Sequence, residues 1–168
     1  MEMPEVEGLR VIRPIGSGEC GSVHLAEDGA GHVVALKLFD GLAIRRGLVA
    51  RMTERLAAGG WPAGVMPVIF SDFEGRPAHR VTPLVADVDA EGEIRPRSLQ
   101  HLLHKHTGES AWPLVREIAT AMAGMHEKRV SHGNLKPGNI YLDAGGHVLI
   151  TDWTLGNMPG IGHFFFTD

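Results

Sequence analysis

The chain has 168 residues, 43% of them hydrophobic, and a formal net charge of −4. This length suits a globular domain with a core, while the acidic balance argues against a nucleic-acid partner. A single cysteine, Cys20, excludes an internal disulfide and favours a cytoplasmic location, and no apolar run approaches the roughly 18 residues of a transmembrane helix. We therefore expect a cytoplasmic domain without a membrane segment.

The first half of the chain is predicted to be β-structure with one helix. Short apolar stretches bounded by turn residues predict five strands, at 9–15, 22–26, 32–39, 65–70 and 80–85. The third strand carries a lone charge, Lys37, among apolar residues. A helix is predicted over 43–58, because Leu48, Met52 and Leu56 recur at a spacing of four.

The second half is predicted to be mainly helical. The polar stretch 87–97 is expected to be a linker or loop. A short helix over 98–105 would begin at Ser98, a good N-cap residue, and a longer helix over 112–128 has a proline near its start. The apolar positions of the longer helix follow helical spacing and are Val115, Ile118, Ala119, Met122 and Met125.

A small hairpin within 140–150 completes the predicted elements. Alternating βαβ units are absent from this pattern, so we expect an α+β fold of two lobes rather than a doubly wound sheet. The first lobe would span 8–86, a linker 87–97, and the second lobe 98–168.

A glycine-rich stretch follows the first strand. Residues 16–23 have the pattern G-x-G-x-x-G-x-V. Phosphate groups approach bare backbone amides most closely where glycines remove the side chain. A dinucleotide-binding turn would need a helix directly after the glycines, whereas the β-like stretch 22–26 follows here. The pattern favours a hairpin loop over phosphates, and an ordinary glycine-rich turn is the alternative.

Three further motifs carry chemistry. Lys37 ends V-A-L-K in an apolar strand, where a buried ammonium needs an anionic partner; a surface lysine is the alternative. Residues 132–139 read H-G-N-L-K-P-G-N. Asp152 follows Asn139 by 13 residues and is either a ligand of a hard cation or a turn-capping aspartate.

The four motifs, in this order, resemble those of serine/threonine protein kinases of bacterial type: the glycine loop, V-A-I-K, H-R-D-L-K-P-x-N and D-F-G. The resemblance covers about residues 9–156 and implies a protein-kinase-like fold with a five-stranded antiparallel sheet. It implies that ATP is bound by Gly16, Ser17, Gly18, Gly21, Val23, Ala35, Lys37, Thr82, Leu84 and Val85. Mg²⁺ would bind Asn139 and Asp152, and Lys136 would neutralise the transferring phosphoryl group.

The chain also departs from the kinase pattern. Asn134 stands where the family has the aspartate that accepts the substrate proton, and a carboxamide cannot take up a proton. Met52 stands where the family has the glutamate that pairs with the strand lysine, and Glu54, two positions on, would face away. Gly133 replaces an arginine and Thr154 a glycine. We therefore expect a pseudokinase, which binds ATP, is not an enzyme, and acts as a signalling, scaffolding or regulatory module.

Three alternatives remain. The chain could be a weakly active serine/threonine kinase, or a structural domain that binds no nucleotide. It could also be a small-molecule phosphotransferase of the aminoglycoside or choline kinase type, whose motifs are H-G-D-x-x-P-x-N and D-W. Gly133 and Trp153 favour that family, whereas Leu135, Lys136 and Pro137 favour protein kinases.

The end of the chain lacks an A-P-E-like motif and later helices. With the second lobe shortened, the helix over 112–128 and the aromatic residues 164–166 would expose apolar surface. We expect a protein partner or self-association through this lobe.

Overall fold

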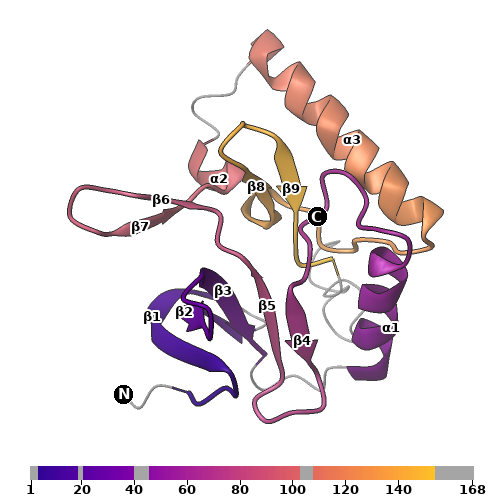
Figure 1. Cartoon of the computed structure of the whole chain (residues 1–168). Helices are drawn as coiled ribbons and strands as arrows, with labels where there is room; N and C mark the ends of the chain where they lie inside the picture. Colours follow the sequence, from indigo (N-terminus) through magenta and orange to yellow (C-terminus); the bar gives the residue numbers. More distant parts are fainter. Residues whose placement is uncertain (1–3, 19–20, 40–45, 103–107, 154–168) are drawn as a thin grey trace. The chain divides into compact units, whose positions relative to one another are not determined.

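The computed structural model describes residues 4–18, 21–39, 46–102 and 108–153. The chain divides into two compact units (Figure 1): the first unit is Met1–Ala50 with Pro67–Leu84, and the second unit is Arg51–Met66 with Val85–Asp168. The second unit thus takes residues from the middle of the chain that the sequence assigned to the first lobe. Residues 154–168, which include Thr154 and the three phenylalanines, lie outside the described ranges.

A five-stranded antiparallel sheet forms the first unit, in the order β1-β2-β3-β5-β4 (Figure 1). Its strands are β1 (Leu9–Gly18), β2 (Gly21–Asp28), β3 (Val33–Leu38), β4 (Phe70–Asp72) and β5 (His79–Pro83). The predicted α+β fold with this sheet is confirmed. The fourth strand begins later than its apolar run suggests: Pro67 lacks the N–H that a ladder needs, and Val65 makes only an isolated bridge to Ile150.

The two faces of the sheet differ in character. Successive side chains of a strand point to opposite faces. One face carries a buried cluster made of Val6, Ala26, Val34, Leu36, Leu38 and Val81, with Leu9 and Val11 packed against it. The alternate positions, which include Ala35 and Lys37, therefore lie on the other face.

Helix α1 (Arg46–Ala57) confirms the predicted helix over the described part of its range. Met52 and Leu56 are buried, whereas Glu54 is exposed, as a rotation of two positions requires. The Lys128 ammonium donates to the carbonyls of Leu56, Ala58 and Gly60 at 3.0, 2.5 and 2.7 Å. These bonds satisfy carbonyl groups that the end of the helix leaves without intrahelical donors.

The stretch expected to be a linker contains a β-hairpin instead, made of β6 (Ala86–Val88) and β7 (Ile94–Pro96). Asp89 builds its turn, because one carboxylate oxygen accepts the N–H groups of Glu91 and Glu93 at 3.2 and 2.8 Å. The sequence did not predict this hairpin, because each strand has only three residues and charged residues surround Val88 and Ile94.

The rest of the second unit is helical with one small hairpin. Its elements are α2 (Leu99–Leu102), the 3-10 turns η2 (Gly108–Ala111) and η3 (Pro137–Asn139), α3 (Trp112–Glu127), β8 (Ile140–Leu142) and β9 (Val148–Ile150). Ser98 precedes α2 as predicted, and its carbonyl accepts the N–H groups of His101 and Leu102. No helix in the described ranges is long and apolar enough to cross a membrane.

Only some of the apolar residues of α3 are buried. Leu114, Ala121 and Met125 are buried, whereas Val115 and Ala119 are exposed. Apolar residues occupy more than one stripe of this helix, and periodicity alone does not say which stripe packs inward. Val115 and Trp112 are 48% and 68% exposed, and the expected protein partner or self-association stays a prediction.

Arg97 connects the two small hairpins of the second unit. Its guanidinium donates to the carbonyls of Leu142 and Asp143, both at 2.9 Å, and to the Asp87 carboxylate at 2.8 Å. In return, the Arg97 carbonyl accepts the Leu142 N–H at 2.9 Å. One side chain therefore holds β6 beside the end of β8.

Candidate active site

The register of the first unit's sheet gathers four of the predicted nucleotide-binding residues on one face. Val23 pairs with Lys37, and Lys37 pairs with Arg80, so these three form a row across β2, β3 and β5. Ala35 pairs with Thr82 in the next row of the same face. Val23, Ala35, Lys37 and Thr82 are all half-buried, on the side of the sheet opposite the apolar cluster.

The glycine-rich stretch is the end of the β1–β2 hairpin. Gly16 pairs with Val23, Ser17 with Ser22, and Gly18 with Gly21, while residues 19–20 lie outside the described ranges. A strand, not a helix, follows the glycines, which contradicts a dinucleotide-binding turn. A Cβ placed on Gly16 would meet nothing nearer than the Val23 Cβ at 3.9 Å, so packing within the protein does not require glycine here.

The predicted hinge lies where the first unit ends. Thr82 and Pro83 are the last residues of β5, Leu84 is the last residue of the first unit, and Val85 begins the second. The Val85 carbonyl accepts the Arg97 N–H at 3.2 Å. A carbonyl oxygen has two lone pairs, so this bond leaves one acceptor site on Val85.

In the second unit, the loop 132–139 is organised by a buried histidine. His132 is 1% exposed; its Nδ1 accepts the Asn134 N–H at 3.1 Å, and its Nε2 donates to the Thr151 carbonyl at 2.9 Å. Burial is the main cause that lowers the pKa of His132, so the ring is neutral at physiological pH. Both ring nitrogens are occupied, and His132 positions the loop rather than exchanging protons.

Asn139 joins this loop to the segment that carries Asp152. Its side-chain amide donates to the Asn134 carbonyl at 2.8 Å, and its own carbonyl accepts the Thr151 N–H at 2.9 Å. Burial raises the pKa of Tyr141, and the Asp152 charge acts in the same direction. The same charge partly offsets the lowering that burial causes in the pKa of His132. The second unit thus brings Asn134, Asn139 and Asp152 together, while Lys136 is exposed on extended backbone.

Two residues of this site have left-handed backbone conformations. Gly133 has φ of 72°, where an arginine, the residue of the kinase motif, would be strained. The glycine therefore fits the turn that this loop makes. Asp152 has φ of 62°, a conformation that aspartate tolerates better than most residues and that is frequent at functional sites.

Among known proteins, the chain is similar to serine/threonine protein kinases. No family model matches it. It is 28% identical over 150 residues to a serine/threonine-protein kinase of Arabidopsis thaliana, 28% identical over 153 residues to the kinase AGC1-5 of the same plant, and 31% identical over 158 residues to the kinase PknD of Chlamydia trachomatis. These alignments cover 88, 89 and 88% of the chain, but only 29, 26 and 17% of the relatives.

The homologues of this chain are serine/threonine protein kinases. The predicted protein-kinase-like fold is confirmed, and the relatives include plant and bacterial kinases, so the bacterial type stays a prediction. The expectation that the chain is not an enzyme is wrong, because its relatives are named as enzymes. That expectation gave Asn134 too much weight, because phosphoryl transfer in kinases depends mainly on positioning and charge stabilisation rather than on the base.

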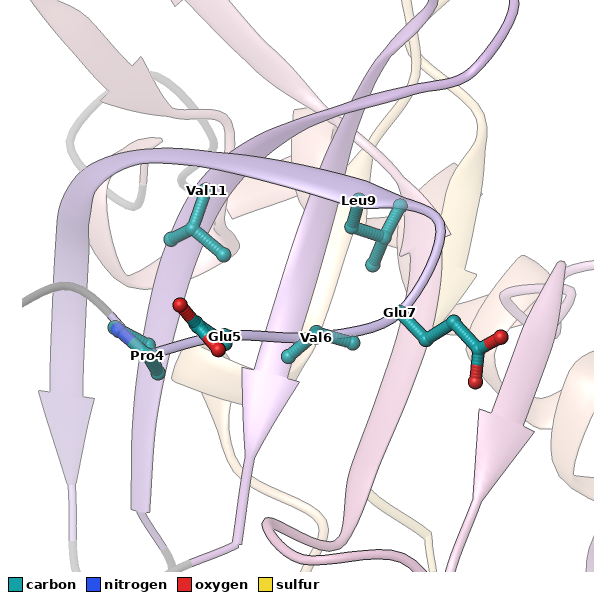
Figure 2. A pocket seen from close by; sticks show the side chains of 6 residues that line it. All are labelled: Pro4, Glu5, Val6, Glu7, Leu9 and Val11. Carbon is teal, nitrogen blue, oxygen red and sulfur yellow. The ribbon is translucent and has the colours of Figure 1, made fainter.

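The kinase site residues do not line the pocket in Figure 2. This hollow of about 610 Å³ is lined by Pro4, Glu5, Val6, Glu7, Leu9 and Val11. Figure 2 shows Leu9 and Val11 of β1 directed toward the segment before it. Val6, Leu9 and Val11 also belong to or pack on the apolar cluster, so the hollow lies on the sheet face opposite Lys37.

Proposed function

We propose that this chain is a slow phosphotransferase, which binds ATP with Mg²⁺ and transfers the γ-phosphoryl group to a serine or threonine hydroxyl. The observation that carries the proposal is the bonded cluster of the second unit, in which His132, Asn139 and Thr151 hold Asn134 beside the segment of Asp152. The names of the homologous kinases support the same reaction.

The oxygen donors of this cluster fit a magnesium ion. Asn139 is 6% exposed and uses its amide N–H toward Asn134, so its amide oxygen is the end left for a cation. Asp152 supplies a carboxylate. In the described ranges no three His, Cys, Asp or Glu residues cluster in a way that could hold a metal ion. The amide oxygen of Asn139 and the carboxylate of Asp152 suit Mg²⁺, which usually binds one or two protein oxygens together with substrate phosphates and water.

In the first unit, the residues proposed to bind the nucleotide lie on the Lys37 face of the sheet. Lys37 would hold the phosphates, and the open space at Gly16 would let them approach the backbone of the hairpin. Val23, Ala35 and Thr82 offer a largely apolar surface for the adenine, with backbone groups of Leu84 and Val85 as its hydrogen-bond partners.

Asn134 makes the proposed reaction slow without abolishing it. A carboxamide oxygen can accept a hydrogen bond from the substrate hydroxyl and orient it, but it cannot remove the proton. The proton then leaves with the transferred phosphoryl group or passes to water. Loss of a general base costs roughly 10²- to 10⁴-fold in rate. Metal and positioning contribute the larger share of the acceleration in a loose transition state.

Two measurements test the proposal. ATP with Mg²⁺ should raise the melting temperature of the wild type, and a hundredfold excess over Kd corresponds to about 2.7 kcal/mol of stabilisation. Labelled γ-phosphate should appear in a pool of serine- and threonine-containing peptides, and Lys37→Ala should lose both effects. A folded wild-type protein that neither binds ATP at millimolar concentration nor transfers phosphate would refute the proposal.

A second acceptor class is worth including in that assay. Gly133 and Trp153 are also typical of small-molecule phosphotransferases. In this chain Gly133 has a left-handed backbone conformation, and Trp153 is fully buried with its ring centroid 5.8 Å from that of Trp61. If hydroxyl-bearing small molecules are the substrates, labelled phosphate should appear in aminoglycoside or choline acceptors and not in the peptides.

A further inference from the structure

Lys37 lies over an aromatic ring of its own strand segment. Phe39 follows Lys37 by two residues, so both side chains lie on the same face of the sheet. The Lys37 ammonium is 5.6 Å from the centroid of the Phe39 ring. This distance is within the range of a cation–π interaction, in which the negative face of the ring attracts the charge.

The Phe39 ring is itself held by a buried stack. The Arg80 guanidinium lies 5.6 Å from the Phe39 centroid and 5.8 Å from that of Phe73, and the two rings are 5.8 Å apart at an angle of 52°. Phe39, Phe73 and Arg80 are only 7, 5 and 2% exposed. The backbone N–H of Phe39 also donates to the Ala78 carbonyl at 3.0 Å. These contacts leave the ring little freedom.

The stack also shapes the electrostatics around Lys37. Lys37 and Arg80 are direct neighbours in the register of β3 and β5, and like charges at such positions repel. A ring that attracts both cations offsets this repulsion, and the attraction is stronger where water is excluded. Lys37 and Arg80 thus both lie near the Phe39 ring despite their like charge.

We propose that Phe39, fixed by Arg80 and Phe73, is a positioning residue that orients Lys37 for the nucleotide phosphates. The inference rests on the proposed function of Lys37.

The test replaces Phe39 by phenylalanines with an increasing number of ring fluorines, which weaken the negative face of the ring and preserve its shape. ATP affinity, measured by calorimetry, should fall stepwise with fluorination. The melting temperature should fall slightly, because the ring also attracts Arg80. Phe39→Leu should weaken ATP binding roughly 3- to 30-fold.

Phe73→Leu is the matched control. It removes an equally buried ring from the same stack, but one that contacts Arg80 and is not the ring beneath Lys37. It should lower stability about as much as Phe39→Leu and weaken ATP binding clearly less, because it removes one support of the Phe39 ring and leaves the ring itself. An equal loss of affinity in both variants, or an affinity independent of fluorination, would overturn the proposal.

A readout without nucleotide separates this inference from the proposed function. The Phe39 ring should shift the NMR signals of the Lys37 ε-methylene group upfield relative to those of Lys128 and Lys136, and Phe39→Leu should abolish the shift. If the shift is present but the wild type binds no ATP, the proposed function fails while the orientation of Lys37 stands. If the wild type binds ATP and the shift is missing, the positioning role fails alone.

Discussion

The two units of this chain hold their candidate site residues by different means. In the first unit, Val23, Lys37 and Thr82 lie on one face because backbone ladders fix the register of β2, β3 and β5. In the second unit, strands are short, and side chains bonded to distant backbone groups hold the loops, as Asn139 and Arg97 do.

This difference determines how much a single side chain matters. A ladder hydrogen bond survives most substitutions, because it belongs to the backbone. A carbonyl that depends on one guanidinium or amide loses its partner when that side chain is removed, and leaving a buried polar group unsatisfied costs about 1–3 kcal/mol. We therefore expect the second unit to be the more sensitive to substitution of polar residues.

The largest expected effect is at Asp152. Asp152→Asn removes the charge that would bind the metal, and we expect phosphoryl transfer to fall by about 10²- to 10³-fold. Asparagine accepts the left-handed backbone conformation as readily as aspartate, so the melting temperature should change little. Steady-state transfer assays and thermal melts on the same preparation measure both. Unchanged transfer would remove Asp152 from the site.

Arg97→Met, compared with Arg10→Met, tests the contrast between the units directly. Arg97 donates to two backbone carbonyls, and its side chain is 25% exposed, so its loss should cost about 2–3 kcal/mol of unfolding free energy. Arg10 pairs with Glu27 across β1 and β2 at 67% exposure, and its loss should cost less than about 1 kcal/mol. Equal costs in urea unfolding would contradict the contrast.

Gly133→Ala sharpens the contrast at the level of the backbone. With φ of 72°, alanine at this position should lower the unfolding free energy by about 1–2 kcal/mol. Gly29→Ala, in the turn between β2 and β3, is the control, since a Cβ there meets nothing within 4 Å and its φ is not in the left-handed region. Urea unfolding of the control should differ from wild type by less than about 0.5 kcal/mol.

The smallest expected effect is the pH dependence that His132 confers. Its pKa in the folded state is lowered by burial, so the unfolded state binds more protons once the pH falls below about 6.5. Stability should therefore fall between pH 7 and 5, by at most about 1.4 kcal/mol per pH unit from this group. His132→Gln should flatten the pH profile of the melting temperature, whereas His126→Gln, at an exposed position, should leave the slope intact.

The difference between backbone ladders and side-chain bonds also explains which features could be predicted from the sequence. Four of the five strands follow from apolar runs bounded by turn residues, whereas β4 begins only where its predicted run ends. The period of two places Lys37 opposite the apolar cluster. The hairpin of β6 and β7 escaped prediction, because its short alternation is masked by acidic residues and its turn depends on the Asp89 carboxylate. The stack of Phe39, Arg80 and Phe73 could not be predicted either, since it requires the register between β3 and β5.

The loop of the second unit shows a further limit. Spacing identified His132, Asn134, Asn139 and Asp152 as one motif set, but the bonds that connect them involve backbone groups of Asn134 and Thr151 that no sequence pattern specifies. Helix α3 shows a similar limit, because its spacing identifies apolar residues but does not say that Met125 packs inward while Val115 stays exposed. Periodicity gives a helix its stripes, and tertiary contacts select among them.

The rate of γ-phosphoryl transfer by Asn134→Asp, relative to the wild type, tests the central claim most directly. If the rest of the site is assembled for phosphoryl transfer and lacks only its base, the aspartate should raise the rate by about 10²- to 10⁴-fold over a slow but measurable wild type. A folded Asn134→Asp protein that binds ATP and transfers no phosphate, or transfers it no faster than the wild type, would contradict the account.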